Sequence, residues 1–154
     1  MSYLTSYNGI VGTLQGLVPT SHPGSYFRPL EFRSFPNLEA AVMSGLIRCF
    51  DLDMVKVGEG PYITNGSVTF QTATIKLTVG YASSAVRLPE ELHSMMVEDM
   101  ATIVGTLRLP ATWTSYAFEL NIEANPEDIQ EVRADNGELA GYTQSYLITA
   151  EWSN

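Results

Sequence analysis

The chain has 154 residues, of which 45% are hydrophobic and 16% are charged, so it is long enough to fold as one domain (residues 1–154) without a disulfide or a metal. Its formal net charge is −9, from 17 acidic and 8 basic residues, and the bases are scattered singly, which argues against binding to a nucleic-acid backbone. The start lacks the pattern of a signal peptide, and no run approaches the ~20 apolar residues of a membrane span, so no membrane partner is expected.

The first 36 residues divide into a predicted helix and a Pro-rich arm. Apolar residues recur at near-helical spacing over residues 1–18, which predicts a short amphipathic helix that ends before Pro19. Residues 19–36 contain four prolines, which favour an extended arm or a long loop over a helix or a central strand. We expect the aromatic side chains of this arm to dock on the same subunit or on a neighbouring one. They are therefore candidate partner contacts: Tyr26, Phe27, Phe32 and Phe35.

The remaining segment, residues 37–154, is expected to form an α+β core. Asn37 is a good N-terminal cap, and the apolar residues after it recur every three or four positions. This spacing predicts a helix over residues 38–50. A strand over residues 42–50 is the alternative, because so short an apolar run fits both structures.

A β-hairpin is predicted around Asn65-Gly66, because both residues tolerate the positive φ of a tight turn and β-forming stretches flank them. Asn65, near the tip of this hairpin, is a candidate partner contact. Residues 73–81 alternate between apolar and polar, with a parity opposite to that of Val68 and Phe70. The mismatch predicts a bulge or a break near Gln71-Thr72.

The longest helix is predicted over residues 89–107, because Pro89, Glu90 and Glu91 form a favourable first turn and Pro110 stops the helix. Seven apolar residues line one side of it: Leu92, Met95, Met96, Met100, Ile103, Val104 and Leu107. We expect this stripe to pack on one sheet face, formed by Ile75, Leu77, Val79, Phe118, Leu120, Ile122, Tyr146 and Ile148. Its three methionines fit an adaptable core, and a Met-rich binding groove is the alternative.

Two further strands are predicted over residues 116–123 and 142–152, where apolar and polar residues alternate. The acidic segment between them, residues 124–140, is expected to be a turn-rich excursion with a tight turn at Asn136-Gly137. Its acids supply the last candidate contacts: Glu127, Asp128 and Asp135. Together these elements predict an α+β fold, with a mixed or antiparallel sheet of four to five strands and two or three helices packed on one face.

No constellation of residues indicates catalysis. His22 and His93 are the two histidines and lack metal-ligand spacing, and neither a Gly-x-Ser-x-Gly elbow nor a phosphate-binding loop is present. The acids near the last strands indicate a solvated face rather than a carboxylate pair or a calcium loop. Cys49, within an apolar stretch, is expected to be a buried thiol. We therefore expect no catalytic residue, no metal and no cofactor.

The order of these elements and the last strand, Ser145-Tyr146-Leu147-Ile148-Thr149-Ala150-Glu151-Trp152, resemble the tail-terminator family of long-tailed bacteriophages. Those neck (head–tail joining) proteins are small α+β proteins whose sheet is flanked by helices, and they often end in a strand of the form aromatic-x-Ile-Thr-x-Glu-aromatic. The likeness covers about residues 37–152, and the Pro-rich arm departs from it.

The resemblance implies a structural virion protein, not an enzyme, made in the host cytoplasm. Its implied partners are copies of itself in a ring, typically six, the tail-tube protein, the head–tail connector protein, and DNA that passes through the channel without specific binding. The arm would reach a neighbouring subunit, and segments 124–140 and 58–66 would make axial contacts. The alternatives are another neck protein (head-closure or adaptor), a tail-tube-like subunit, or a soluble β-rich module that binds a carbohydrate or another ligand.

Overall fold

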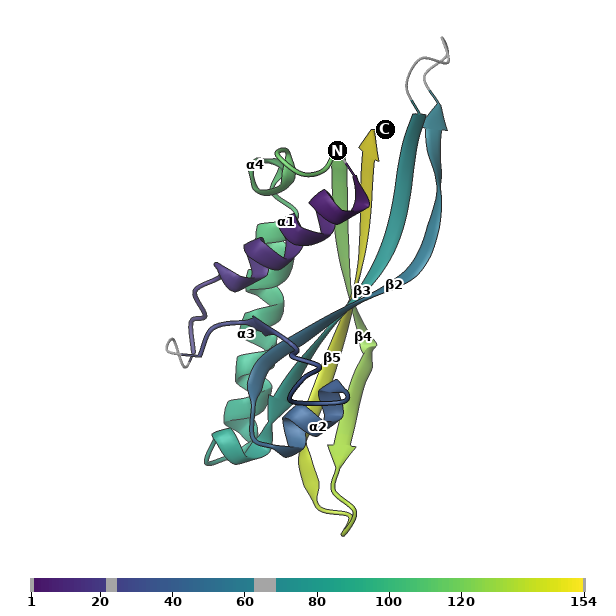
Figure 1. Cartoon of the computed structure of the whole chain (residues 1–154). Coiled ribbons are helices and arrows are strands. Elements are labelled where there is room, and N and C mark those ends of the chain that lie inside the picture. Colours follow the sequence, from purple (N-terminus) through teal and green to yellow (C-terminus); the bar gives the residue numbers. More distant parts are fainter. Residues whose placement is uncertain (1, 22–24, 63–68, 154) are drawn as a thin grey trace.

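The fold is built on one five-stranded sheet, in the order β1-β2-β3-β5-β4 (Figure 1). The computed structural model describes residues 2–21, 25–62 and 69–153, with the backbone alone at 59–62, 69–70, 125–128 and 153. The strands are β1 (Arg28–Pro29), β2 (Ile47–Tyr62), β3 (Thr69–Ala82), β4 (Glu119–Arg133) and β5 (Leu139–Ser153). β1 is parallel to β2 and the other pairs are antiparallel, which confirms the predicted α+β fold with a mixed sheet.

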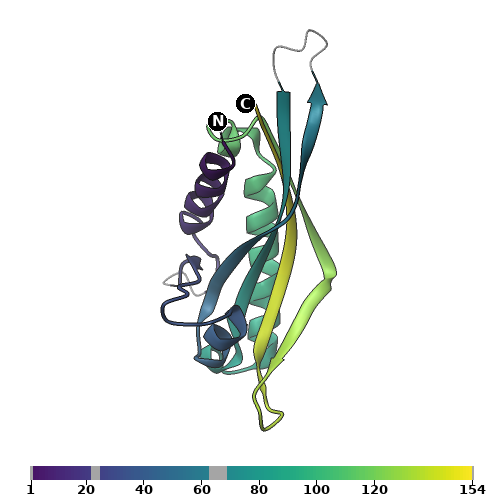
Figure 2. The same cartoon turned by 45° about the vertical axis from the view of Figure 1, so that its right-hand side comes forward.

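Helices cover the two faces of the sheet unequally (Figures 1 and 2). They are α1 (Tyr3–Gln15), α2 (Leu38–Met43), α3 (Pro89–Leu107) and α4 (Pro110–Trp113), with a 3-10 turn, η1 (Ser83–Ala85). On β3, the Tyr81 hydroxyl donates a hydrogen bond to Asp99 of α3, whereas a Cβ atom at Gly80 would lie 2.7 Å from Val42 of α2. Successive residues of a strand point to opposite faces, so α2 lies across the sheet from α3.

The helix predicted over residues 38–50 stops after six residues, at Met43. The Asn37 side chain caps α2 by accepting a hydrogen bond from the Ala40 N–H at 2.8 Å. Gly45 then adopts a φ of +91°, in the left-handed region that glycine tolerates best, and the chain enters β2 at Ile47. The helix prediction is therefore wrong beyond Met43, and the alternative of a strand holds from Ile47 onward.

The β2–β3 hairpin is confirmed by antiparallel pairing out to Tyr62 and Thr69, although Asn65-Gly66 itself lies outside the described residues. β3 itself has no bulge near Gln71-Thr72, because it pairs with β5 in unbroken register along its length. The irregularity expected there lies on the facing strand, where β2 has one extra residue between Glu59 and Tyr62, the partners of Gln71 and Thr69.

The core between α3 and the sheet follows the predicted stripe closely. Leu92, Met95, Ile103 and Leu107 are fully buried against the sheet residues that were expected to face them. Phe118 is the exception: it is 57% exposed and stands just before β4, so its predicted place in the core is wrong. The predicted strand at 116–123 starts late, because the chain is still turning after α4.

The acidic segment 124–140 is mostly strand rather than a loop. β4 continues to Arg133 across a wide bulge, in which the chain between Ala124 and Ile129 has three more residues than the facing part of β5. The tight turn at Asn136-Gly137 is confirmed: Gly137 has a φ of +84°, and the Asn136 side chain accepts a hydrogen bond from the Glu138 N–H at 3.0 Å. This segment therefore extends the sheet and bends its outer strand (Figure 2).

Candidate functional site

The Pro-rich arm docks largely on its own subunit. β1 pairs with β2, and Phe27 is only 2% exposed, so its prediction as a partner contact is corrected: it belongs to the core. Phe35 is half-buried in a small cluster with Leu30 and Leu38. Tyr26 and Phe32 are 51% and 65% exposed and remain available to a partner. The arm was expected to dock on the same subunit or on a neighbouring one. Two of its four aromatic residues, Phe27 and Phe35, pack on the same subunit.

A buried arginine fastens the arm to the helical layer. Arg48 has a φ of +58° at an irregular point of β2, and its side chain is fully buried. The guanidinium donates to the carbonyl of Ser21 at 2.6 Å and to that of Ser25 at 3.1 Å, and it lies 5.7 Å from the centre of the Phe27 ring. The arm is therefore held at both sides of residues 22–24.

The charge of this arginine is balanced by Asp99 of α3. Arg48 donates from Nε to one carboxylate oxygen at 2.8 Å and from Nη2 to the other at 3.0 Å, and the Tyr81 hydroxyl adds a third hydrogen bond at 2.9 Å. Burial raises the pKa of Asp99, and the hydrogen bond and charge of Arg48 oppose that rise. The cluster is an internal fastener rather than a reactive site, because its polar groups face one another.

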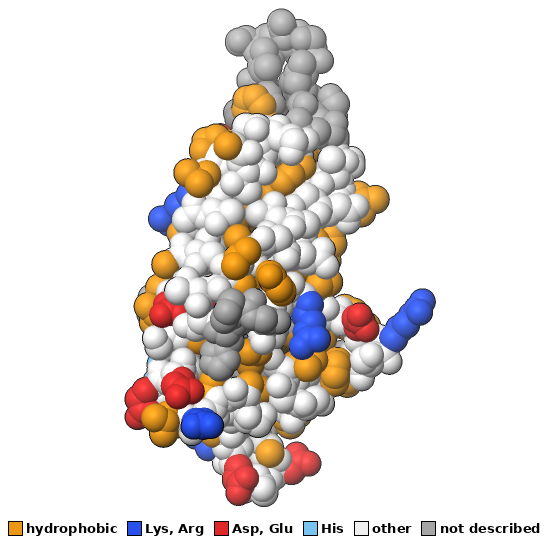
Figure 3. All heavy atoms as spheres, turned by 90° about the vertical axis from the view of Figure 1, so that its left-hand side faces the viewer, with side chains coloured by type: hydrophobic (Ala, Val, Ile, Leu, Met, Phe, Trp, Pro, Cys, Tyr) orange, Lys and Arg blue, Asp and Glu red, His pale blue; other side chains and the backbone are white. Residues whose placement is uncertain are grey.

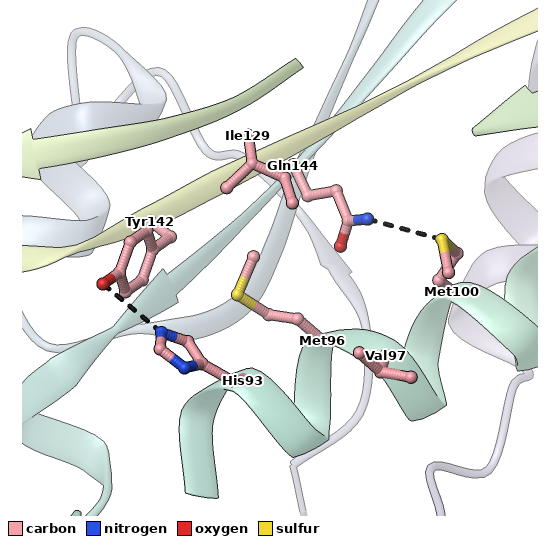
Figure 4. A pocket seen from close by; sticks show the side chains of 7 residues that line it. All are labelled: His93, Met96, Val97, Met100, Ile129, Tyr142 and Gln144. Atoms are coloured by element: carbon pink, nitrogen blue, oxygen red, sulfur yellow. Dashed lines mark hydrogen bonds between the residues drawn. The ribbon is translucent and has the colours of Figure 1, made fainter. Parts of the chain in front are cut away.

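An apolar groove lies between the first half of α3 and two strands of the sheet, the edge strand β4 and its neighbour β5 (Figure 4). Its volume is about 290 Å³, and it is lined by His93, Met96, Val97, Met100, Ile129, Tyr142 and Gln144. The wide bulge of β4 ends at Ile129 and places that side chain on the groove side, opposite Gln144. A Met-rich groove was the alternative to a core role for the methionines of α3. Two of them take part in both: Met96 and Met100 line this surface groove and also pack in the core.

One buried side-chain atom of the groove, Oε1 of Gln144, has no hydrogen-bond partner among the described residues. Gln144 is 3% exposed, and its Nε2 donates to the Met100 sulfur at 3.7 Å. A buried carbonyl oxygen that accepts no hydrogen bond is unfavourable, so an occupant with a donor would stabilise it. At the rim, the His93 ring packs edge-on against Tyr142, with 5.4 Å between the ring centres.

Each side of the sheet has a backbone edge with no partner strand among the described residues: the part of β2 that β1 does not cover, and β4. β1 covers only Cys49 and Phe50 of β2, and β4 is the last strand on the other side of the sheet. Beyond β1, β2 exposes three apolar side chains: Met54 (44%), Val55 (58%) and Val57 (53%). Open edges and exposed apolar residues on opposite sides of one sheet can pair with further chains.

Four predicted contacts belong to segments other than the arm. Asn65 lies outside the described residues, and Glu127 and Asp128 lie in the β4 bulge, where only the backbone is described. Asp135 is exposed in the β4–β5 turn, at the opposite end of the sheet from the β2–β3 hairpin (Figures 1 and 2). Of these four residues, Asp135 is the one whose side chain the structure describes.

On the face shown in Figure 3, apolar side chains are scattered from end to end and most of the charged side chains lie in the lower half of the view. Within the described part of the chain, no three His, Cys, Asp or Glu side chains are grouped as a metal site would require. None of the described helices is long and apolar enough to cross a membrane. Cys49 is buried, as expected, and its burial raises the pKa of the thiol.

Comparison of the chain with models of known protein families and with curated proteins gives no match.

Proposed function

We propose that this chain is a structural virion protein of a long-tailed phage, a tail terminator whose copies form a ring that caps the tail tube and joins it to the head connector. The observation that supports this most strongly is the sheet with two open edges: β2 on one side and β4 on the other. Two different surfaces on opposite sides of a subunit permit head-to-tail contacts, and such contacts form a ring when the rotation closes.

The proposed mechanism depends on shape rather than on reaction chemistry. One face of the ring would match the last tube ring and stop further addition, and the other would match the connector. The net charge of −9 suits a channel for DNA, because acidic walls repel the phosphate backbone and let it pass without binding.

The surfaces for each partner follow from exposure. Tyr26 and Phe32 of the arm are exposed aromatic residues on a docked segment, so we assign them to a neighbouring subunit. The β4–β5 turn with Asp135 and the β2–β3 hairpin stand at opposite ends of the sheet, so they are assigned to the two axial partners.

Electron microscopy of the purified protein in negative stain tests this proposal. Single closed rings would support a terminator, because a terminator stops after one layer. Filaments would instead indicate a tail-tube-like subunit, which polymerises alone. A ring that binds the connector protein and not the tail tube would indicate a head-closure or adaptor protein.

A ligand-binding module is the second candidate, and the apolar groove beside α3 favours it. At about 290 Å³ the groove is at the lower limit of pockets that hold small molecules, which span roughly 300–1,000 Å³. A monomer in solution that retains a small apolar compound through purification would support this candidate over the ring.

A further inference from the structure

We propose that the groove between α3 and the β4–β5 hairpin holds the exposed Met54–Val57 stretch of β2 from a second copy of this chain. The inference rests on the proposed ring and specifies which two surfaces meet in it. Four observations support it: the chemistry of the groove, the chemistry of the stretch, the placement of charge, and the position of the two surfaces on opposite edges of the sheet.

The groove suits an occupant that is mainly apolar and carries a hydrogen-bond donor. Val97 and Ile129, on its two walls, are 61% and 43% exposed, which is unfavourable for large apolar side chains left in water. Met96 extends from α3 toward the space between Tyr142 and Gln144 (Figure 4). The partnerless Oε1 of Gln144 is the one buried acceptor there, and it can accept a hydrogen bond from an N–H group.

The Met54–Val57 stretch has this chemistry. Three of its four side chains are apolar and exposed, and an irregularity in the pairing of β2 with β3 falls between Met54 and Lys56. Because β1 covers only Cys49 and Phe50, this part of β2 also presents backbone N–H groups along an open edge. One such group, or the ammonium of Lys56, would satisfy the acceptor in the groove.

Charge favours the same pairing. The two lysines of the chain, Lys56 and Lys76, both lie in the β2–β3 hairpin, whereas acids flank the groove. Glu90 stands one helical turn before His93, and Glu131, which pairs across the strands with Tyr142, is already bound by Arg133 of its own chain. In a chain with a net charge of −9, placing lysines opposite these acids reduces the repulsion between copies.

The two surfaces also fit a contact that repeats. The groove lies at the β4 edge and the stretch at the β2 edge, so each copy can offer one surface to each neighbour, as a head-to-tail assembly requires. Gln144 is level with Val79 of β3, and Met54 is level with Ile75, four residues farther along the strand. This is an offset of about 13 Å at the rise of an extended strand. The strands would therefore be tilted relative to the ring axis, as they are in closed barrels.

Charged substitutions at exposed positions test the contact without disturbing the core. Val57→Asp and Val97→Asp should each raise the dissociation constant of the assembly by about tenfold or more, measured by analytical ultracentrifugation, because each puts a carboxylate into a buried apolar contact. Combining Val57→Asp with Val97→Lys should restore assembly, because the two charges then attract. The matched controls are Val18→Asp and Leu109→Asp: these residues are 66% and 59% exposed and lie outside both surfaces, so their assembly should match that of the unmodified protein.

The outcomes separate this inference from the proposed ring. Rings that persist in both Val57→Asp and Val97→Asp would overturn the inference and leave the ring standing. Loss of assembly in Val97→Asp alone would show that the groove takes another part of the chain, which also overturns it. A monomeric unmodified protein would overturn both proposals. Retention of a small apolar compound that Val97→Asp releases, detected by mass spectrometry, would assign the groove to a ligand instead.

Discussion

Replacing Asp99 by Asn keeps the shape of the side chain but removes the negative charge that faces Arg48 in the interior. Both side chains are almost fully buried, at 0% and 1% exposure, and their closest nitrogen–oxygen distance is 2.8 Å. Removing one partner of a buried ion pair leaves an uncompensated charge and costs about 3–5 kcal/mol. For a domain whose unfolding free energy is about 5–15 kcal/mol, this is a large fraction of the total.

Urea unfolding followed by circular dichroism measures this loss. With an m value of about 2 kcal/mol per molar urea, the midpoint of D99N should fall by about 1.5–2.5 M. The matched control is Glu131→Gln, which breaks the Arg133–Glu131 pair at the same 2.8 Å distance but at 51% and 52% exposure, and it should change stability by less than about 0.5 kcal/mol. A loss below about 1 kcal/mol in D99N would refute the argument that Arg48 depends on Asp99 for its charge balance.

Three further predictions concern helix packing, pH and assembly. Gly9→Ala should destabilise α1 strongly, because a Cβ atom there would lie 2.2 Å from the Tyr116 ring. Gly12→Ala in the same helix places a Cβ atom with nothing within 4 Å, so it should stabilise the protein by about 0.5–1 kcal/mol. Thermal unfolding measures both changes. Burial raises the pKa of Asp51 above 3.8, so its contribution to stability is fully present below about pH 3.8 and is lost as the pH rises through its folded-state pKa. Asp51→Asn should remove this part of the slope of unfolding free energy against pH. An unchanged slope would contradict the assignment to Asp51. Phe32→Ser should weaken assembly and leave the unfolding of the separated subunit unchanged, because the Phe32 side chain is 65% exposed. A lower unfolding temperature of the monomer would instead show that Phe32 has a role inside the subunit.

The elements that were predicted well carry their signals locally. α3 begins at a proline followed by two acids and keeps one apolar stripe to its end, so sequence spacing alone locates its bounds and its buried side. The boundary between α2 and β2 was missed, because residues 38–50 form one apolar run that suits both structures. The local sign of the change was Gly45, which takes up the positive φ that ends the helix.

The features that were missed depend on contacts between distant residues. Arg48 stands in an apolar run and is fully buried only because Asp99, 51 residues later in the chain, lies opposite it. The groove depends on the register of β4 against β5, where three extra residues bring Ile129 beside Gln144. The spacing of the methionines in α3 fits either a core or a groove. No local sequence pattern shows that Met96 takes part in both.

Native mass spectrometry over a wide range of protein concentration tests the central claim, that the chain acts as a ring-forming structural subunit, most directly. The account predicts one discrete assembly at a fixed multiple of the 16.9 kDa subunit mass, six by the resemblance, that does not grow as the concentration rises. A species that stays at the mass of one subunit at the highest concentration would contradict it.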